Sequence, residues 1–217
     1  VTIDKEQFGM GLTVPDDGLI HMPINLPGIG TVEAEVRRYR VFDAMSTLVA
    51  MTENGPVRYG APTSVLVRGS IPSIPSSFVV MAIYPNWATG YIDMGENYDH
   101  KNFLISPLSI EAANSVMIVY DRDAVKQQYS WTCSTEEPKG LRMTKPKGQE
   151  SQQVRYRIIT VALEGDDAYY IDHGRNLTKA TQYAEAVVAA SSAIYERDLT
   201  ATIRVGQIYI WTTTDPY

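Results

Sequence analysis

The sequence predicts a mainly β protein with an α/β C-terminal part: an antiparallel β-sandwich followed by a β-α-β unit. Three observations predict this fold class. Short apolar segments, separated by Gly, Pro and Asn, fill the chain up to residue 133. A polar segment follows at 134–153. Residues 154–217 then contain a strand, one long amphipathic helix and a second strand.

The first part has the two-residue period of half-buried strands. In 31–42, Val32, Ala34 and Val36 fall on one face and charged residues fall on the other. Strands at this spacing favour an antiparallel sandwich or barrel, and we expect no long helix before the polar segment. Further strands are expected in 63–71, 76–85, 102–107 and 115–121.

The polar segment divides the chain. It contains two prolines and two glycines, a composition typical of an exposed linker. We therefore expect a β-sandwich in 1–133, a linker in 134–153 and an incomplete β-α-β unit in 154–217.

The helix of that unit is expected near 177–198, with Asn176 as its N-cap. An apolar stripe at helical spacing predicts that Tyr183, Val187 and Ile194 pack on the two strands. The full stripe consists of Ala180, Tyr183, Ala184, Val187, Val188, Ser191, Ile194 and Tyr195.

The second strand, 200–211, carries apolar side chains on both faces, which is typical of a strand paired on both sides. Three sources could supply its second neighbour. In order of preference, they are a later part of the polypeptide, the β-rich half and a second copy of the chain.

Composition narrows the function classes. The net charge of −6 and pI near 5.1 give no basic patch for a nucleic acid, and no apolar run is long enough to span a membrane. One cysteine cannot form an internal disulfide. A start at Val1 fits removal of a signal peptide or trimming of flexible ends. The abundance of Tyr, Ser and Thr, with few Lys, favours an extracellular or secreted protein.

Residues 155–217 resemble the start of the catalytic domain of reprolysin-like (adamalysin) zinc metallopeptidases, which are metzincins. The matching features are Arg155-Tyr156, a long helix ending in Tyr195-Glu196-Arg197, and a strand closing on Ile210-Trp211. The segment 65–107 resembles the propeptide of the same family, with a Gly-bearing strand, a Gly-Tyr-Ile hairpin and a strand ending in Pro. The resemblance covers roughly 32–217.

The resemblance implies a zinc enzyme whose metal motif is missing here. Zincins bind zinc through His-Glu-x-x-His on a helix, and in this family the motif lies downstream of the Ile-Trp strand. The three histidines, His21, His100 and His173, include no pair four residues apart. We expect no catalytic residue, no metal ligand and no cofactor in this chain, and zinc only in a downstream part.

The expected function is therefore the N-terminal part of a secreted metallopeptidase precursor, inactive alone. Its partner would be its own downstream catalytic part. The alternative is a non-catalytic extracellular structural protein that self-assembles with further copies of itself through strand edges. A ligand-binding sandwich is a third possibility.

Cys133 is the one candidate metal ligand that the resemblance implies. A propeptide cysteine at a similar place in the family donates its thiolate to the catalytic zinc. The surrounding "SWTCSTE" departs from the family's Pro-Lys-Met-Cys-Gly pattern, and the alternative is a small buried thiol.

Two acidic segments and the tryptophans are expected to be structural. Residues 164–173 could hold a metal but suit a solvated loop better, and 93–100 suits a β-hairpin with acidic ends. Asn176 also starts a glycosylation sequon. The residues concerned are Glu164, Asp166, Asp167, Asp172 and His173 in the first segment, Asp93, Glu96, Asp99 and His100 in the second, and Trp87, Trp131 and Trp211 as core residues.

Overall fold

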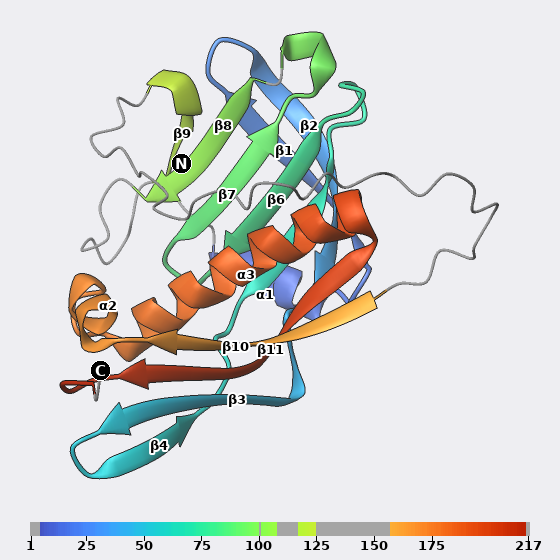
Figure 1. The fold of residues 1–217 in the computed structure, drawn as a ribbon. Coiled ribbons are helices and arrows are strands. Elements are labelled where there is room, and N and C mark those ends of the chain that lie inside the picture. The colour runs from blue at the N-terminus through green and yellow to red at the C-terminus, as the bar shows by residue number, and fades with distance from the viewer. Residues whose placement is uncertain (1–4, 100, 108–116, 125–156, 216–217) are drawn as a thin grey trace, which may run out of the picture.

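A computed structural model describes residues 5–99, 101–107, 117–124 and 157–215. Two sheets lie on either side of one long helix, α3 (Leu177–Leu199) (Figure 1). One sheet has seven antiparallel strands and is curled, and the other is a mixed sheet of four strands. The expected class, mainly β with an α/β C-terminal part, is confirmed at this level.

The curled sheet has the strand order β1-β2-β5-β6-β7-β8-β9, and every neighbouring pair is antiparallel. The expected strands in 31–42, 63–71, 76–85, 102–107 and 115–121 are all present. They form one curled sheet rather than two stacked sheets, so the expectation of a sandwich was wrong. The bounds are β1 Leu19–Leu26, β2 Gly30–Tyr39, β5 Val65–Ser70, β6 Phe78–Ile83, β7 Ala88–Asp93, β8 Asn102–Pro107 and β9 Met117–Asp121.

Both faces of β6 are buried, which explains the continuous apolar run of this strand. Phe78, Val80 and Ala82 face the core around α3, whereas Val79 and Met81 face a second core inside the curl. A strand buried on both faces loses the alternation of a half-buried strand. The segment 76–85 therefore predicts a strand but not which core each residue enters.

A short helix, α1 (Lys5–Thr13), packs on the inner core through Phe8 and Leu12. No helix of useful length was expected here, and Gly9 and Gly11 give the segment a low helix propensity. Gly11 lets α1 approach β5, since a Cβ at this position would lie 3.2 Å from Val65.

The mixed sheet has the order β10-β11-β3-β4, with β10 Arg157–Gly165, β11 Ala201–Trp211, β3 Phe42–Thr52 and β4 Gly55–Tyr59. Strands β10 and β11 are parallel and α3 connects them, as expected for a β-α-β unit. On its other side, β11 pairs in parallel with β3, for example Ile208 with Leu48 and Ile210 with Ala50. The β-rich half thus supplies the second neighbour of β11, the second of the three sources considered above.

The expected helix is confirmed, and its ends have clear causes. Asn176 is the N-cap, and its side-chain oxygen accepts a hydrogen bond of 3.1 Å from the backbone N–H of Lys179. Thr200, in the left-handed region with φ 51°, ends the helix and allows the turn into β11.

The expected orientation of α3 was wrong. Tyr183 and Val187 are 48% and 50% exposed, although they were expected to pack on the strands, and only Ile194 packs against the core. The physical reason is that α3 lies between two sheets, so the small and polar residues of its other faces are buried at close approach. The buried residues of α3 are Ala180, Thr181, Gln182, Glu185, Ala186, Val188, Ala189, Ser192 and Ala193.

Within the described part of the chain, no helix is long and apolar enough to cross a membrane.

Candidate functional site: the interface between α3 and the curled sheet

The interface through which α3 contacts the curled sheet, hereafter the α3 interface, joins the β-α-β unit to the β-rich half. Two tyrosines of the curled sheet donate hydrogen bonds to backbone carbonyls of the helix. The Tyr39 hydroxyl donates to the Ala189 carbonyl at 2.8 Å, and the Tyr84 hydroxyl donates to the Gln182 carbonyl at 2.6 Å. Burial raises the pKa of both hydroxyls, which keeps them neutral donors at any ordinary pH.

Trp87 extends this contact. Its indole N–H donates to the side-chain oxygen of Gln182 at 2.8 Å, and its ring stacks on Tyr84 with centroids 4.6 Å apart. The carbonyl and the side chain of Gln182 therefore both bind the β6–β7 connection. A buried amide with two such partners fixes the position of the helix along the sheet.

An ion pair fixes the other end of the helix. Arg68 of β5 contacts both carboxylate oxygens of Glu196, at 2.7 Å and 2.5 Å, and its guanidinium also lies 4.7 Å from the centre of the Tyr39 ring. The two side chains are only 21% and 23% exposed. Paired in this bidentate geometry, a half-buried arginine adds both orientation and stability.

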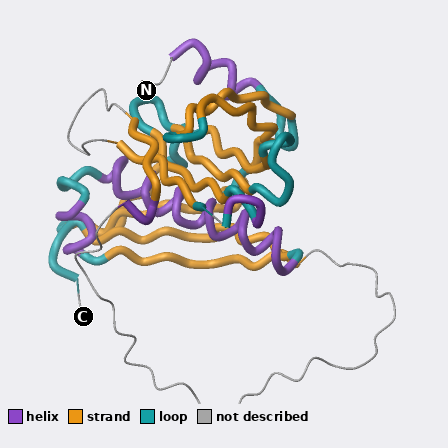
Figure 2. Tube along the Cα trace, turned by 90° about the horizontal axis from the view of Figure 1, so that it is seen from above, coloured by secondary structure: helices purple, strands orange, loops and turns teal. Residues whose placement is uncertain are grey.

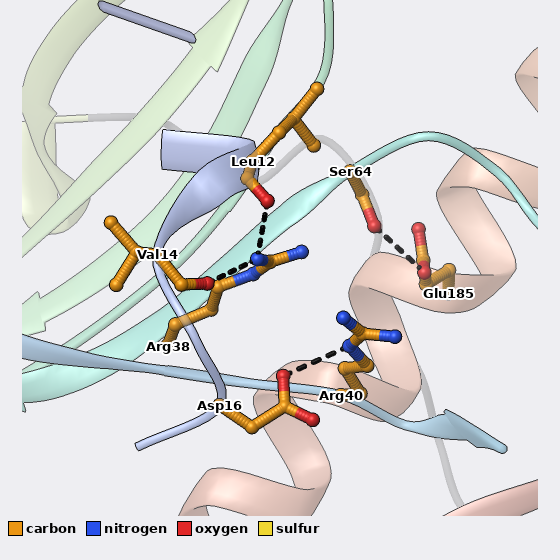
Figure 3. Close-up of polar contacts among 7 residues, drawn as sticks. All are labelled: Leu12, Val14, Asp16, Arg38, Arg40, Ser64 and Glu185. Carbon is orange, nitrogen blue, oxygen red and sulfur yellow. Dashed lines mark hydrogen bonds and ion pairs between the residues drawn. The ribbon is translucent and has the colours of Figure 1, made fainter. Parts of the chain in front are cut away.

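Glu185 lies in the middle of the α3 interface and is 2% exposed. Its Oε1 accepts a hydrogen bond of 2.9 Å from the Ser64 hydroxyl, whereas its Oε2 has no partner among the described residues (Figure 3). Burial raises the pKa of this carboxyl to about 7, and the neighbouring hydroxyls of Ser64 and Tyr84 offset part of that rise. Glu185 therefore changes its charge near neutral pH inside the interface.

Two arginines hold the chain before β1 against the end of β2 (Figure 3). Arg38 is 7% exposed, and its guanidinium donates to the carbonyls of Leu12, at 2.7 Å, and Val14. Arg40 pairs with Asp16 at 2.9 Å on the surface. The hydrogen bonds of Arg38 satisfy carbonyls at the C-terminal end of α1, where a positive charge is favourable.

The α3 interface is made of direct contacts between the helix and the β-rich half. Among the described residues, no group of three or more His, Cys, Asp and Glu side chains could hold a metal ion. The polar groups of the α3 interface mostly bind backbone carbonyls or each other, so what they do chemically is to hold two sheets on one helix. Because burial raises the pKa of Glu185, we expect the strength of that contact to depend on pH.

Most of the acidic segment 164–173 forms a short helix and not the expected solvated loop. Asp166 caps the short helix α2 (Asp167–Asp172) by accepting from the Tyr169 N–H at 2.7 Å. The Nδ1 of His173 lies 2.7 Å from the Tyr169 carbonyl, and Glu164 accepts from the Trp211 indole at 2.6 Å. These side chains have separate structural partners.

The second acidic segment joins β7 to β8, which pair antiparallel as the expected hairpin. Asp93 accepts a hydrogen bond from the Gly95 N–H at 2.8 Å, and a single turn of 3₁₀ helix follows at Glu96–Tyr98. Trp87 packs against both cores, as expected of a core residue.

Several predictions fall on residues that the structure does not describe. Cys133, Trp131, His100 and the linker 134–153 lie outside the described residues, and the cysteine-switch prediction stays a prediction.

Sequence reasoning missed most of the α3 interface. Glu185 was available as a signal, because it interrupts a run of small and apolar residues in "YAEAVVAASSA". Ser64, the partner of Glu185, lies 121 positions away from it, and Tyr84 lies 98 positions away from its partner Gln182, so no local pattern links them to the helix.

A scan against models of known protein families and a search of curated proteins found no match for this chain.

Proposed function

We propose that this chain is the N-terminal part of a secreted reprolysin-like zinc metallopeptidase precursor, inactive by itself, whose propeptide-like half is held on the start of the catalytic domain. The observation that carries the proposal is the pairing of β3 with β11. A strand of the half that resembles a propeptide completes the sheet of the half that resembles a metzincin.

This pairing joins the two halves through backbone as well as side chains. The hairpin of β3 and β4 extends the sheet on one side of α3, and the curled sheet packs on the other. A strand added to a sheet edge binds through main-chain hydrogen bonds, which give affinity without a covalent link. A propeptide held in this way would stay bound after the chain between the halves is cut.

The two histidines that the structure describes lie in separate surroundings. His21 pairs with Glu33 and Glu35 on the outside of the curled sheet, and His173 contacts Tyr169 at the end of α2. His21 lies in β1 and His173 at the C-terminal end of α2, and they belong to no shared group of possible metal ligands among the described residues. Under the proposal, the zinc site and the general base belong to the polypeptide downstream of β11.

The parent protein provides the test. We would produce it with a specific protease site inserted into 134–153, and measure zinc content and peptide hydrolysis before cleavage, after cleavage, and after removal of the N-terminal half under mild denaturant. We expect one zinc per chain, association of the halves after cleavage, and activity only after removal of the N-terminal half. A parent sequence without His-Glu-x-x-His, or one that binds no zinc, would contradict the proposal.

Self-assembly is the second candidate, and the outer edge of β10 favours it. Among the described residues β10 pairs only with β11, and Ile158 and Ile159 are 58% and 40% exposed. An exposed apolar strand edge is a template for another chain. Sedimentation velocity of the 217-residue chain should then show association that rises with concentration and is lost in Ile159→Lys. A monomer at all concentrations would exclude this candidate.

A further inference from the structure

The inside of the curled sheet contains a cavity of about 680 Å³, and its walls are apolar. The strands of the sheet curve around this interior when it is viewed from above (Figure 2). Residues from α1 and from β1, β5, β6, β7, β8 and β9 line the cavity. Its volume falls in the range of pockets that hold one small molecule.

We propose that this cavity binds one uncharged apolar molecule of small-ligand size. The proposal is independent of the proposed peptidase, because it concerns the β-rich half alone. Closed antiparallel barrels of similar strand number have an interior that holds one small ligand. Here the curl of the sheet and the packing of α1 form a comparable interior.

The chemistry of the wall defines the ligand class. The deep part of the cavity is formed by buried apolar side chains such as Ile24, Met81 and Ile105. The polar side chains that line it are Thr13, His21 and Asn25, and all three are exposed. A charged group would lose its hydration inside this wall and would find no partner there among the described residues, which excludes an ionic ligand core.

The opening of the cavity lies beside α1 and β1. Met10 of α1 and Leu19 of β1 line the cavity and are 62% and 46% exposed, so the cavity reaches the surface on this side.

Part of the cavity wall is held in place by a hydrogen bond to α1, and part consists of flexible methionine side chains. Arg38 anchors the end of α1 through the Leu12 carbonyl, which fixes the position of this helix over the interior. Four methionines, Met10, Met22, Met81 and Met117, line the cavity from different elements. Methionine side chains adjust to ligands of different shape, so the cavity suits a class of ligands rather than one compound.

The methionines also provide the readout. We would label the 217-residue chain with ¹³C at the methionine methyl groups and titrate it with N-phenyl-1-naphthylamine, an uncharged apolar fluorophore. We expect saturable binding of one probe per chain, with shifts at the four cavity methionines. Met45, Met51 and Met94 do not line the cavity and serve as internal controls, so their signals should not move.

Matched variants locate the probe independently. Ile20→Trp fills the cavity from β1, and Val57→Trp places the same side chain on the exposed strand β4. We expect Ile20→Trp to weaken binding by about tenfold or more, which corresponds to a loss of about 1.4 kcal/mol. Val57→Trp should leave binding unchanged. Tyr183→Ser with Val187→Ser, which removes the exposed stripe of α3, should also have no effect.

Three results would overturn the proposal: absence of saturable binding, shifts confined to methionines outside the cavity, or loss of binding in the α3 double variant. Circular dichroism and thermal unfolding show whether each variant is folded. If Ile20→Trp does not fold, the methyl shifts of the unmodified chain decide the question alone.

Discussion

The hydroxyl of Ser64 donates a 2.9 Å hydrogen bond to the carboxylate of Glu185, and this contact joins the chain before β5 to the middle of α3. The second carboxylate oxygen of Glu185 has no partner among the described residues. The ionised form is therefore poorly solvated, whereas the protonated form suits its surroundings. From this relationship we derive a dependence of stability on pH.

The unmodified protein should become less stable as pH rises, and Glu185→Gln should abolish this dependence. Burial raises the pKa of Glu185 from its ordinary value of 4.5 to about 7 in the folded state. Between these values the folded state holds a proton that the unfolded state has released, so the contribution of this group falls as pH rises from about 4.5 to 7. The full difference corresponds to roughly 3 kcal/mol.

Urea unfolding at pH 5, 6, 7 and 8 checks this prediction, with pH values chosen to span that window. The unmodified chain should lose stability relative to Glu185→Gln across the series. Glu53→Gln, an exposed glutamate in the β3–β4 turn, is the control and should follow the unmodified chain. Parallel curves for all three proteins would show that Glu185 does not titrate in this range.

The pair of Arg68 and Glu196 should stabilise the α3 interface measurably. A double-mutant cycle with Arg68→Ala and Glu196→Ala is expected to give a coupling energy of about 1–2 kcal/mol, because both side chains are half-buried and the contact is bidentate. The same cycle on Arg40 and Asp16, which are 59% and 54% exposed, should give less than about 1 kcal/mol. Equal coupling energies in the two cycles would contradict this ranking.

A truncation at Val187 tests which face of α3 is buried, and a truncation at Ile210 in β11 is the comparison at a buried position. Ile210 is fully buried in β11, and Ile210→Ala should cost about 2–5 kcal/mol of unfolding free energy. Val187 is half exposed, and Val187→Ala should cost less than about 1 kcal/mol. A large cost at Val187 would mean that the apolar stripe is covered in solution, by a second copy or by another part of the chain.

The close approach of β2 and β5 should make Gly69 irreplaceable. A Cβ at Gly69 would lie 2.0 Å from the Glu35 carbonyl oxygen and 2.7 Å from the Val36 Cα, and both are backbone atoms that cannot move aside. Gly69→Ala should cost about 3 kcal/mol or more, or prevent folding. Gly60→Ala, where a Cβ meets nothing within 4 Å, is the control and should fold with nearly unchanged thermal stability.

The sequence predicts the elements of this fold better than their assembly. The period of 31–42, and the helix near 177–198 with Asn176 as its N-cap, depend on neighbours in the chain, and these predictions were confirmed. The hairpin of β3 and β4 was missed because "FDAMSTLVAMT" lacks strict alternation. Its pairing with β11 brings together residues about 160 positions apart, which no local pattern encodes.

The orientation of α3 shows why the site itself was hard to predict. A stripe of large apolar residues normally marks the buried face of a helix, since burial of their area stabilises the fold most. In α3 the small residues Ala186, Ala189 and Ala193 are buried instead, because two sheets approach the helix closely. Buried polar residues such as Glu185 find their partners only in this assembled state, so composition alone does not identify them.

The pairing of β11 on both sides leads to the last prediction, which concerns the amides of Ile208 to Trp211. Strand β3 pairs with this segment on one side and β10 pairs with it up to Ile210 on the other, so its partners lie within the same chain. The backbone N–H of Thr212 extends the contact by donating to the Met51 carbonyl at 3.0 Å. Hydrogen exchange at these amides should be slow and independent of protein concentration.

Strand β10 is the internal comparison for that measurement. Its amides that point away from β11 have no strand partner among the described residues, so they should exchange quickly in dilute solution. Protection that appears at β10 on concentration, while β11 stays constant, would show that a second copy pairs with the outer edge. Protection at β11 that disappears on dilution would contradict its pairing with β3, because a sheet completed within one chain does not depend on the concentration of that chain.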